Sequence, residues 1–299
     1  MTSVRHFLEV DDLTAAELAK VLELSADPSP TLVLEGKGMA LLFEKPSART
    51  RHSMEMAVVQ LGGHPVSIAG GEVGIDKRES AEDIARTLAC FHAAIGARVF
   101  DHGLVERMAA VSPVSVVNML SDQAHPLQAL GDLLTVTQEF GPISGRRIAF
   151  VGDANNVSRS LAIGAGMAGA EFVLSGPPGY HFSSADIDRI SAAGGTAEFV
   201  DDPVEAVADA HVVYTDVWVS MGEEDQAPEK MEAFAGYIVD EALMARADPD
   251  AIFLHCLPAR PGLEATEGVL YGPQSRIWQQ AENRMHAARG LLTFLLGMT

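Results

Sequence analysis

Hydroxyl groups and arginines gather after the first apolar run of this sequence that predicts a buried strand. The run 39–43 leads into Glu-Lys-Pro, and a helix is expected to begin at about Ser47. The first turn of a helix has unbonded backbone N–H groups and a partial positive charge. With the hydroxyls of Ser47 and Thr50 and the guanidinium of Arg49, this turn could bind a phosphate group. A capped helix followed by a solvated basic turn explains the same residues equally well.

A glycine follows the first apolar run of the second half, where dinucleotide-binding proteins carry a Gly-rich turn. The segment reads Gly-Asp-Ala-Asn-Asn-Val-Ser from Gly152, so the spacing Gly-x-Gly-x-x-Gly is absent. No acidic partner for a ribose is identifiable either, which disfavours a nicotinamide dehydrogenase. The amides of Asn155 and Asn156 could instead bind the carboxylate and the amine of an amino acid, or cap the next helix.

Two more groups of residues with chemical potential follow apolar runs further along the chain. Asp216 could hold a substrate ammonium group, or cap the turn that follows it. His255 and Cys256 come directly after the run 251–254, and no second ligand cluster with the spacing of a zinc site accompanies them. We therefore expect no metal, and Cys256 is either a buried core thiol or, at a strand end, a reactive one.

Alternating strands and helices must position these residues. Apolar runs predict strands, and amphipathic stretches between them predict helices. Buried strands are expected at 39–43, 66–68, 94–99 and 115–119, and further strands at 147–151, 171–174, 197–200, 211–215 and 251–254. Helices are expected at 81–91, 104–110, 126–140, 158–168, 183–193 and 281–296. This alternation indicates an α/β fold with doubly wound parallel sheets, which bind ligands at the carboxyl ends of their strands.

The composition limits the partners that this chain can have. Its 299 residues suffice for two domains, and 47% are hydrophobic and 21% charged, as in ordinary globular proteins. It has 41 acidic and 21 basic residues, a formal charge of −20, which disfavours nucleic acid and anionic membranes as general partners. Two cysteines, no apolar run of membrane length and an N-terminus unlike a signal peptide predict a cytoplasmic protein.

Motifs of the first half resemble those of the aspartate and ornithine carbamoyltransferases. Ser-Ala-Arg-Thr-Arg at 47–51 is similar to the family's carbamoyl-phosphate signature Ser-Thr-Arg-Thr-Arg, with Ala48 in place of a Thr. His-Pro-Leu-Gln, from His125 to Gln128, resembles the family's His-Pro-x-Gln, which opens a long linking helix. Arg98 ends an expected strand where the family has another phosphate and carbonyl ligand. Without the resemblance, His125 would be interpreted as a histidine that caps a helix or packs in the core. Arg98 would be interpreted as an ordinary charged residue at the end of a strand.

Motifs of the second half resemble the ornithine branch of that family. These are Asp-Ala-Asn-Asn from Asp153, Asp-Val-Trp-Val-Ser-Met-Gly from Asp216, and His-Cys-Leu-Pro from His255. The patterns of the aspartate branch are absent, and Ala-Glu-Asn-Arg at 281–284 resembles the motif before the family's last helix. The chain departs from the family at Ala48, Ala154, Gly74 and 259–264, and Gly74 stands where many members have a Gln that reaches a neighbouring subunit.

The resemblance implies roles for residues that match the motifs. Carbamoyl phosphate would contact Ser47, Ala48, Arg49, Thr50, Arg98, His125, Gln128, Cys256, Leu257 and Arg284. Ornithine would contact Asn156, Asp216, Ser220 and Met221. The catalytic residues would be Arg98, His125, Asp216 and Cys256, with no metal or organic cofactor. Because several of these residues are arginines, the site is expected to be positive despite the acidic composition.

The resemblance also implies an activity and an assembly. The expected reaction is carbamoyl transfer from carbamoyl phosphate to the δ-amine of L-ornithine, giving L-citrulline and phosphate in arginine metabolism. A carbamoyl-phosphate-binding domain over 1–140, an ornithine-binding domain over 141–280 and a C-terminal helix over 281–299 that packs on the first domain are expected, in a homotrimer or a multiple of trimers. A carbamoyltransferase for another amine such as putrescine, and a catalytically silent binding module, are the alternatives.

Overall fold

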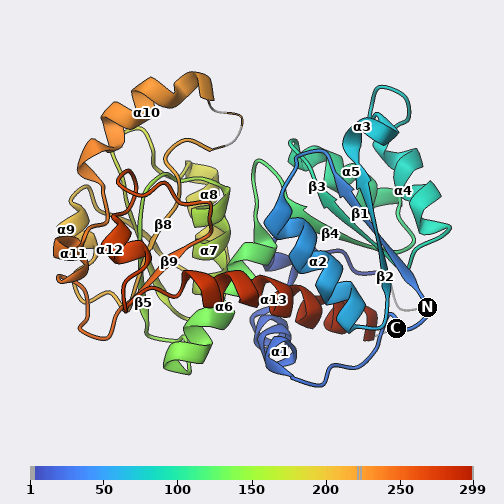
Figure 1. Ribbon diagram of the computed structural model, residues 1–299, viewed down its shortest axis with the longest axis horizontal. Helices are drawn as coiled ribbons and strands as arrows, with labels where there is room; N and C mark the ends of the chain where they lie inside the picture. The colour runs from blue at the N-terminus through green and yellow to red at the C-terminus, as the bar shows by residue number, and fades with distance from the viewer. Residues whose placement is uncertain (1–3, 221, 223, 298–299) are drawn as a thin grey trace. The chain divides into compact units, whose positions relative to one another are not determined.

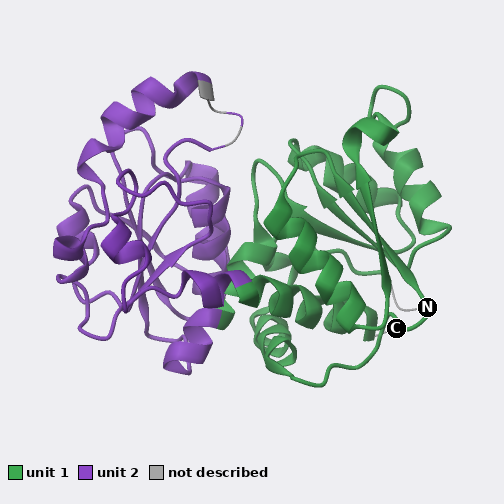
Figure 2. Cartoon of the chain, viewed as in Figure 1, with its two compact units in different colours: residues 1–134, 282–299 green, residues 135–281 purple. Residues whose placement is uncertain are grey.

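The computed structural model describes residues 4–220, 222 and 224–297, whose helices and strands are shown in Figure 1. The chain forms two compact units, Met1–Leu134 with Glu282–Thr299, and Thr135–Ala281 (Figure 2). The expected boundary after residue 140 is the end of helix α6 (Pro126–Phe140), whereas the units divide inside that helix. Helix α13 (Ile277–Gly297) carries the chain from the second unit back to the first.

The first unit contains a sheet of four parallel strands in the order β2-β1-β3-β4. The chain passes from β1 to β2 on one side and then to β3 on the other, so the carboxyl ends of β1 and β3 form a topological switch point. The strands are β1 (Gly38–Phe43), β2 (His64–Ala69), β3 (Ala94–Arg98) and β4 (Ser115–Leu120). The other elements are η1 (Val10–Asp12), α1 (Ala15–Ala26), α2 (Ala48–Gln60), α3 (Gly70–Val73), α4 (Ala81–Ala89) and α5 (His102–Val111).

Helices α4 and α5 cover one face of this sheet. Their apolar side chains, among them Ile84, Leu88 and Val105, pack with Ala40 of β1 and Ile95 of β3 in one buried cluster. Fully burying a side chain of this size contributes about 1.5–3 kcal/mol, so the cluster holds the strands firmly. Strand ends that carry functional groups are thus fixed by the core beneath them.

The second unit contains a sheet of five parallel strands in the order β7-β6-β5-β8-β9. Its switch point lies between β5 and β8. The strands are β5 (Arg147–Val151), β6 (Glu171–Ser175), β7 (Ala197–Phe199), β8 (Val212–Thr215) and β9 (Ile252–His255). The other elements are α7 (Asn156–Met167), α8 (Ser184–Ala192), α9 (Pro203–Ala206), η2 (Glu224–Gln226), α10 (Ala227–Ala233), η3 (Phe234–Gly236), α11 (Glu241–Met244) and α12 (Glu267–Leu270).

The α/β fold with two parallel sheets is confirmed, and several bounds and burial details differ from the prediction. The strand at 66–68 is only half-buried, because β2 is an edge strand. The last helix begins at Ile277 rather than 281; its first turn exposes Trp278, so no apolar period marks it in the sequence. Helix α4 ends at Ala89 rather than 91. Within the described residues, no helix is long and apolar enough to cross a membrane.

Candidate active site

The first turn of α2 lies directly after the carboxyl end of β1. Ser47 caps this helix: its side-chain oxygen accepts a hydrogen bond from the N–H of Thr50 at 3.3 Å. Ala48 and Arg49 are exposed at the same turn, and Thr50 is buried. The capped helix of the plainer interpretation is therefore present, and the donors that a phosphate needs are at the same place.

Two buried arginines converge on the hydroxyl of Thr50. Arg98 ends β3, the neighbour of β1, and its Nη1 donates to Thr50 Oγ1 at 3.1 Å. Arg284 reaches the same oxygen from α13, with Nη2 at 2.9 Å. The hydroxyls of Ser47 and Thr50 are also hydrogen-bonded to each other, at 3.2 Å, so Thr50 Oγ1 joins the helix cap to both arginines. Burying two like charges this close together is costly, and a bound anion would compensate it.

Positive charge also surrounds His125, which is buried just before α6. Burial lowers the pKa of His125 well below its usual value. Nearby cations lower this pKa further, namely Arg284, Arg98, Arg49 and Lys45. The imidazole is therefore neutral near pH 7 and can serve as a neutral hydrogen-bond donor. This part of the first unit is positive although the whole chain is acidic.

We expect His125 to make the protein less stable in mild acid. In the unfolded chain His125 binds a proton below about pH 6.5, whereas in the folded protein it does not. The free energy of unfolding should therefore fall by up to about 1.4 kcal/mol per pH unit, from pH 6.5 down to the folded-state pKa. Urea unfolding of the wild type and of His125→Gln at pH 7.5 and 5.5 measures this, because other histidines contribute equally to both proteins. Equal pH dependence of the two proteins would contradict it.

Two residues near this site matter although they were not among the predicted ones. Lys45 follows β1, acts on His125 and has its ammonium group 5.2 Å from the centre of the Phe100 ring. Asp132 accepts a hydrogen bond from Gln128 Nε2 at 2.8 Å, and both side chains are fully buried. The spacing of four residues on one helix was the available signal for that pair.

In the second unit, neighbouring strand ends bring Asp216, Cys256 and Asn155 together. β8 pairs with both β5 and β9, so the residues that follow these three strands are adjacent. Cys256 Sγ donates to Asp216 Oδ1 at 2.9 Å, and Asn155 Nδ2 donates to Asp216 Oδ2 at 3.0 Å. The N–H of Val217 also donates to Oδ1, at 2.8 Å. Asp216 is thus a buried, oriented carboxylate that could hold a cationic amine.

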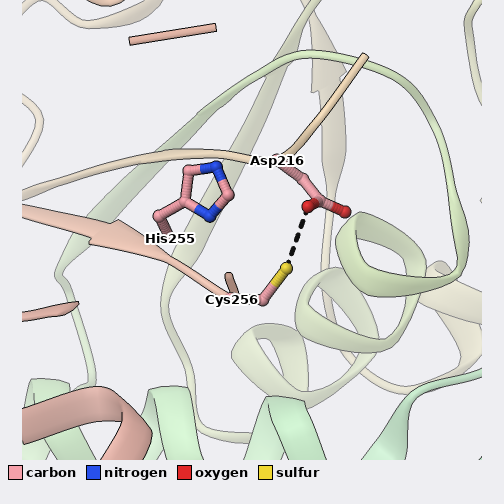
Figure 3. Close-up of side chains that lie close together, drawn as sticks. All are labelled: Asp216, His255 and Cys256. Carbon is pink, nitrogen blue, oxygen red and sulfur yellow. Dashed lines mark hydrogen bonds between the residues drawn. The ribbon is translucent and has the colours of Figure 1, made fainter. Parts of the chain in front are cut away.

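His255, Cys256 and Asp216 form a cluster whose ligand atoms all lie within 4.8 Å of one another (Figure 3). However, both ring nitrogens of His255 are engaged: Nδ1 accepts from the N–H of Leu257 at 2.8 Å, and Nε2 lies 3.1 Å from Glu264 Oε1. Because Nδ1 is an acceptor, Nε2 carries the proton and no lone pair of the ring is left for a metal. The geometry favours a hydrogen-bonded cluster that fixes the backbone next to Cys256. Glu264, buried in an irregular segment, had no signal in the sequence.

The structure also places the other residues that the sequence singled out. Asn156 is the first residue of α7, whereas Asn155, its neighbour, caps that helix and contacts Asp216. Leu257 has a φ of 62°, a left-handed conformation that costs a non-glycine residue energy and is often found at functional sites. Ser220 is half-buried after β8, and Met221 lies outside the described residues. Gly74 has a φ of 64°, so a Gln at this position would be strained.

Comparison with known proteins relates both units to one family. Residues 5–138 match the model described as the carbamoyl-P binding domain of aspartate/ornithine carbamoyltransferase, and residues 144–295 match the model of its Asp/Orn binding domain. The chain belongs to the aspartate/ornithine carbamoyltransferase family. The resemblance seen in the motifs is thereby confirmed.

Within the aspartate/ornithine carbamoyltransferase family, the chain is similar to proteins of the ornithine branch. An ornithine carbamoyltransferase of Acidothermus cellulolyticus is 47% identical, over 98% of this chain and 97% of that protein. An anabolic ornithine carbamoyltransferase of Pyrococcus furiosus is 41% identical, over 98% of this chain and 96% of that protein. The solved structure of ornithine carbamoyltransferase from Pyrococcus furiosus has a TM-score of 0.94 at 40% identity, covering 99% of this chain and 98% of that one.

Proposed function

We propose that this protein transfers the carbamoyl group of carbamoyl phosphate to the δ-amine of L-ornithine, giving L-citrulline and phosphate. The observation that carries the proposal is the convergence of Arg98 and Arg284 on Thr50 Oγ1 at the N-terminus of α2. A dianion there gains charge-assisted hydrogen bonds and removes the repulsion between two buried guanidiniums. The relatives named ornithine carbamoyltransferase support ornithine as the second substrate.

Carbamoyl phosphate binds to the first unit in this proposal. The phosphate takes hydrogen bonds from the N-terminus of α2, from Ser47, Ala48, Arg49 and Thr50, and from Arg98. His125 and Arg284 donate to the carbamoyl oxygen, where negative charge develops during attack. Gln128 contacts the carbamoyl amide. The family resemblance adds Cys256 and Leu257 to the residues proposed to contact carbamoyl phosphate.

Ornithine binds to the second unit. Asn156 and the turn with Ser220 and Met221 hold its α-carboxylate and α-amine, and Asp216 lies next to the reacting end. The δ-amine nitrogen attacks the carbonyl carbon, and the bond from this carbon to the phosphate oxygen breaks, which releases phosphate. The amine must attack as the free base; its ordinary pKa resembles that of Lys, about 10.4, so only about one molecule in a few thousand is reactive at pH 7. Asp216 and Cys256 are the candidates for steering the amine and accepting its proton, and the departing phosphate is an alternative acceptor.

Replacement of Cys256 by Ala should weaken the use of ornithine. The variant removes one of the two donors to Asp216 Oδ1, so the carboxylate loses one of the bonds that orient it. We expect the KM for ornithine to rise about three- to tenfold, as the loss of one hydrogen bond of ordinary strength predicts, or the pH optimum to shift. Steady-state kinetics from pH 6.5 to 9.5 measure both. An unchanged KM together with an unchanged pH profile would exclude the thiol from the mechanism.

The assembly and the cellular role remain predictions. We infer a homotrimer or a multiple of trimers from the family resemblance, and a cytoplasmic enzyme from the composition. The domains at 1–140 and 141–280, with 281–299 returning to the first, are inferred to bind carbamoyl phosphate and ornithine respectively. The relative named anabolic supports a role in arginine biosynthesis.

The proposal is tested by an assay of carbamoylated product with three amines. Purified protein and carbamoyl phosphate are mixed with ornithine, putrescine or aspartate, and initial rates are compared. We expect kcat/KM for ornithine to exceed that for either other amine by at least about 100-fold, because putrescine lacks the α-carboxylate and aspartate lacks the δ-amine that the site is built to bind. A preference for putrescine would support the alternative carbamoyltransferase, and no product with any amine would support a silent binding module.

A further inference from the structure

Gln128 and Asp132 form a fully buried pair one turn apart on α6. Gln128 Nε2 donates to Asp132 Oδ1 at 2.8 Å, and neither residue has exposed surface. A carboxylate can only accept hydrogen bonds, so the nitrogen of the amide, and not its oxygen, must face Asp132. Asp132 therefore decides which way the Gln128 amide points.

The other end of this amide is a buried acceptor. Among the described residues, Gln128 Oε1 has no hydrogen-bond partner. Buried carbonyl oxygens are nearly always paired, so this one indicates a group that arrives with a ligand. His125 directly precedes α6, and Gln128 lies in its first turn; a Cβ at Gly131, a further turn on, would be 3.4 Å from Arg284. Gln128 thus lies on the face of α6 that is turned toward Arg284, one of the two arginines that contact Thr50.

We propose that Asp132 is a positioning residue that makes Gln128 a hydrogen-bond acceptor for the N–H of the carbamoyl group, and that this pair gives the site its preference for a carbamoyl phosphate over an acyl phosphate. The inference rests on the proposed function, which puts carbamoyl phosphate in this site. Acetyl phosphate has nearly the same shape, with a methyl group in place of the amide NH₂. It leaves Gln128 Oε1 unpaired, and the bond to Asp132 prevents the amide from rotating to avoid this. A site that hydrogen-bonds an N–H group strongly rejects an analogue without it.

An exchange of the two functional groups tests the proposal. In Gln128→Glu, a second carboxylate faces Asp132, and the two repel each other unless they share a proton. In the double variant Gln128→Glu with Asp132→Asn, the new amide NH₂ donates to one oxygen of the new carboxylate. The other oxygen of that carboxylate still accepts from the carbamoyl N–H. The exchanged pair of residues 128 and 132 has the same net charge as the original pair. The side chain at position 128 still offers the substrate a hydrogen-bond acceptor and no donor.

The measurement is the ratio of the Kd for acetyl phosphate to the Kd for carbamoyl phosphate, taken by titration at pH 8.5. Four proteins are compared: the wild type, Gln128→Glu, Asp132→Asn and the double variant. Glu106→Gln, a substitution of an exposed residue, is the control, and thermal unfolding tests whether each protein is folded. We expect Gln128→Glu to lower the ratio by about tenfold or more, which corresponds to about 1.4 kcal/mol. The double variant should recover it to within about threefold of the wild type. In Gln128→Glu alone, the ratio should rise as the pH falls, because a shared proton replaces the lost N–H.

A double variant that folds normally but stays as unselective as Gln128→Glu would overturn the proposal, because Gln128 would then act as a donor. A ratio in Gln128→Glu that stays at the wild-type value at every pH tested would overturn it as well, because the carboxylate of Asp132 would then have no influence on the acceptor. If Gln128→Glu does not fold, Gln128→Met takes its place in the comparison, since it offers no acceptor. These titrations use no ornithine, so a protein that binds carbamoyl phosphate selectively but forms no citrulline would end the proposed function and leave this inference standing.

Discussion

Replacement of Arg49 by Ala is expected to lower kcat/KM for carbamoyl phosphate by about 10²- to 10³-fold, the size of the loss when one preorganised donor to a reacting oxyanion is removed. Arg49 is exposed at the first turn of α2, next to the Ser47 cap and the buried Thr50. Its guanidinium can therefore bind a phosphate that enters from solvent. Because the side chain is exposed, its removal leaves no cavity in the core, and the fold should be retained.

The control for this experiment is Arg86→Ala. Arg86 is an exposed arginine on α4 of the same unit, and it pairs with Asp83 at 2.9 Å. A surface ion pair of this kind contributes about 0–1 kcal/mol to stability, so its loss should have little effect on the reaction. Steady-state kinetics and circular dichroism of both variants provide the comparison. Near-normal turnover by Arg49→Ala would rule out the phosphate assignment at α2.

Replacement of Asp216 by Asn is expected to lower kcat/KM for ornithine by about 10²- to 10³-fold, as the loss of one partner of a buried charged pair does. The carboxylate accepts from Cys256 Sγ, Asn155 Nδ2 and the N–H of Val217. An asparagine of the same shape carries no charge to attract an amine, and its NH₂ group would face at least one of these donors. Substrate affinity and the orientation of the neighbouring groups should both suffer.

The effect should be specific to ornithine. Titration of Asp216→Asn with carbamoyl phosphate alone should give a Kd within about threefold of the wild-type value. A change of that size is smaller than the largest effect expected from the loss of one neutral hydrogen bond. Asp188→Asn, an exposed substitution on α8 of the same unit, serves as the control. Equal losses for the two substrates would indicate damage to the fold, and a wild-type kcat/KM for ornithine would remove Asp216 from the mechanism.

Strand ends were the part of the site most open to prediction from the sequence. Apolar runs indicated parallel strands, and parallel strands place their carboxyl ends at one edge of a sheet. Arg98 lies within reach of Thr50 for this reason, since β3 pairs with β1. Cys256 lies next to Asp216 because β9 pairs with β8. In both cases a local pattern was enough to predict the element, and sheet topology did the rest.

Some contacts could not be predicted from the sequence, namely those made by irregular segments, by one of two adjacent similar residues, or through tertiary packing. Glu264 reaches His255 across nine residues without regular structure, and no periodicity marks such a contact. Asn155 contacts Asp216, although the resemblance drew attention to Asn156; two adjacent amides in a sequence do not reveal which one caps the helix. The charge of Lys45 lowers the pKa of His125 because tertiary packing brings the two residues close together, and a sequence pattern does not show this.

The most direct test of the account follows the carbamoyl carbon itself. The purified protein is incubated with ¹³C-carbamoyl phosphate and L-ornithine, and products are followed by NMR together with a phosphate assay. The account predicts that the label appears in the side-chain carbamoyl group of citrulline, in a one-to-one ratio with released phosphate, and that Arg49→Ala nearly abolishes both signals. Release of phosphate without labelled citrulline would contradict it.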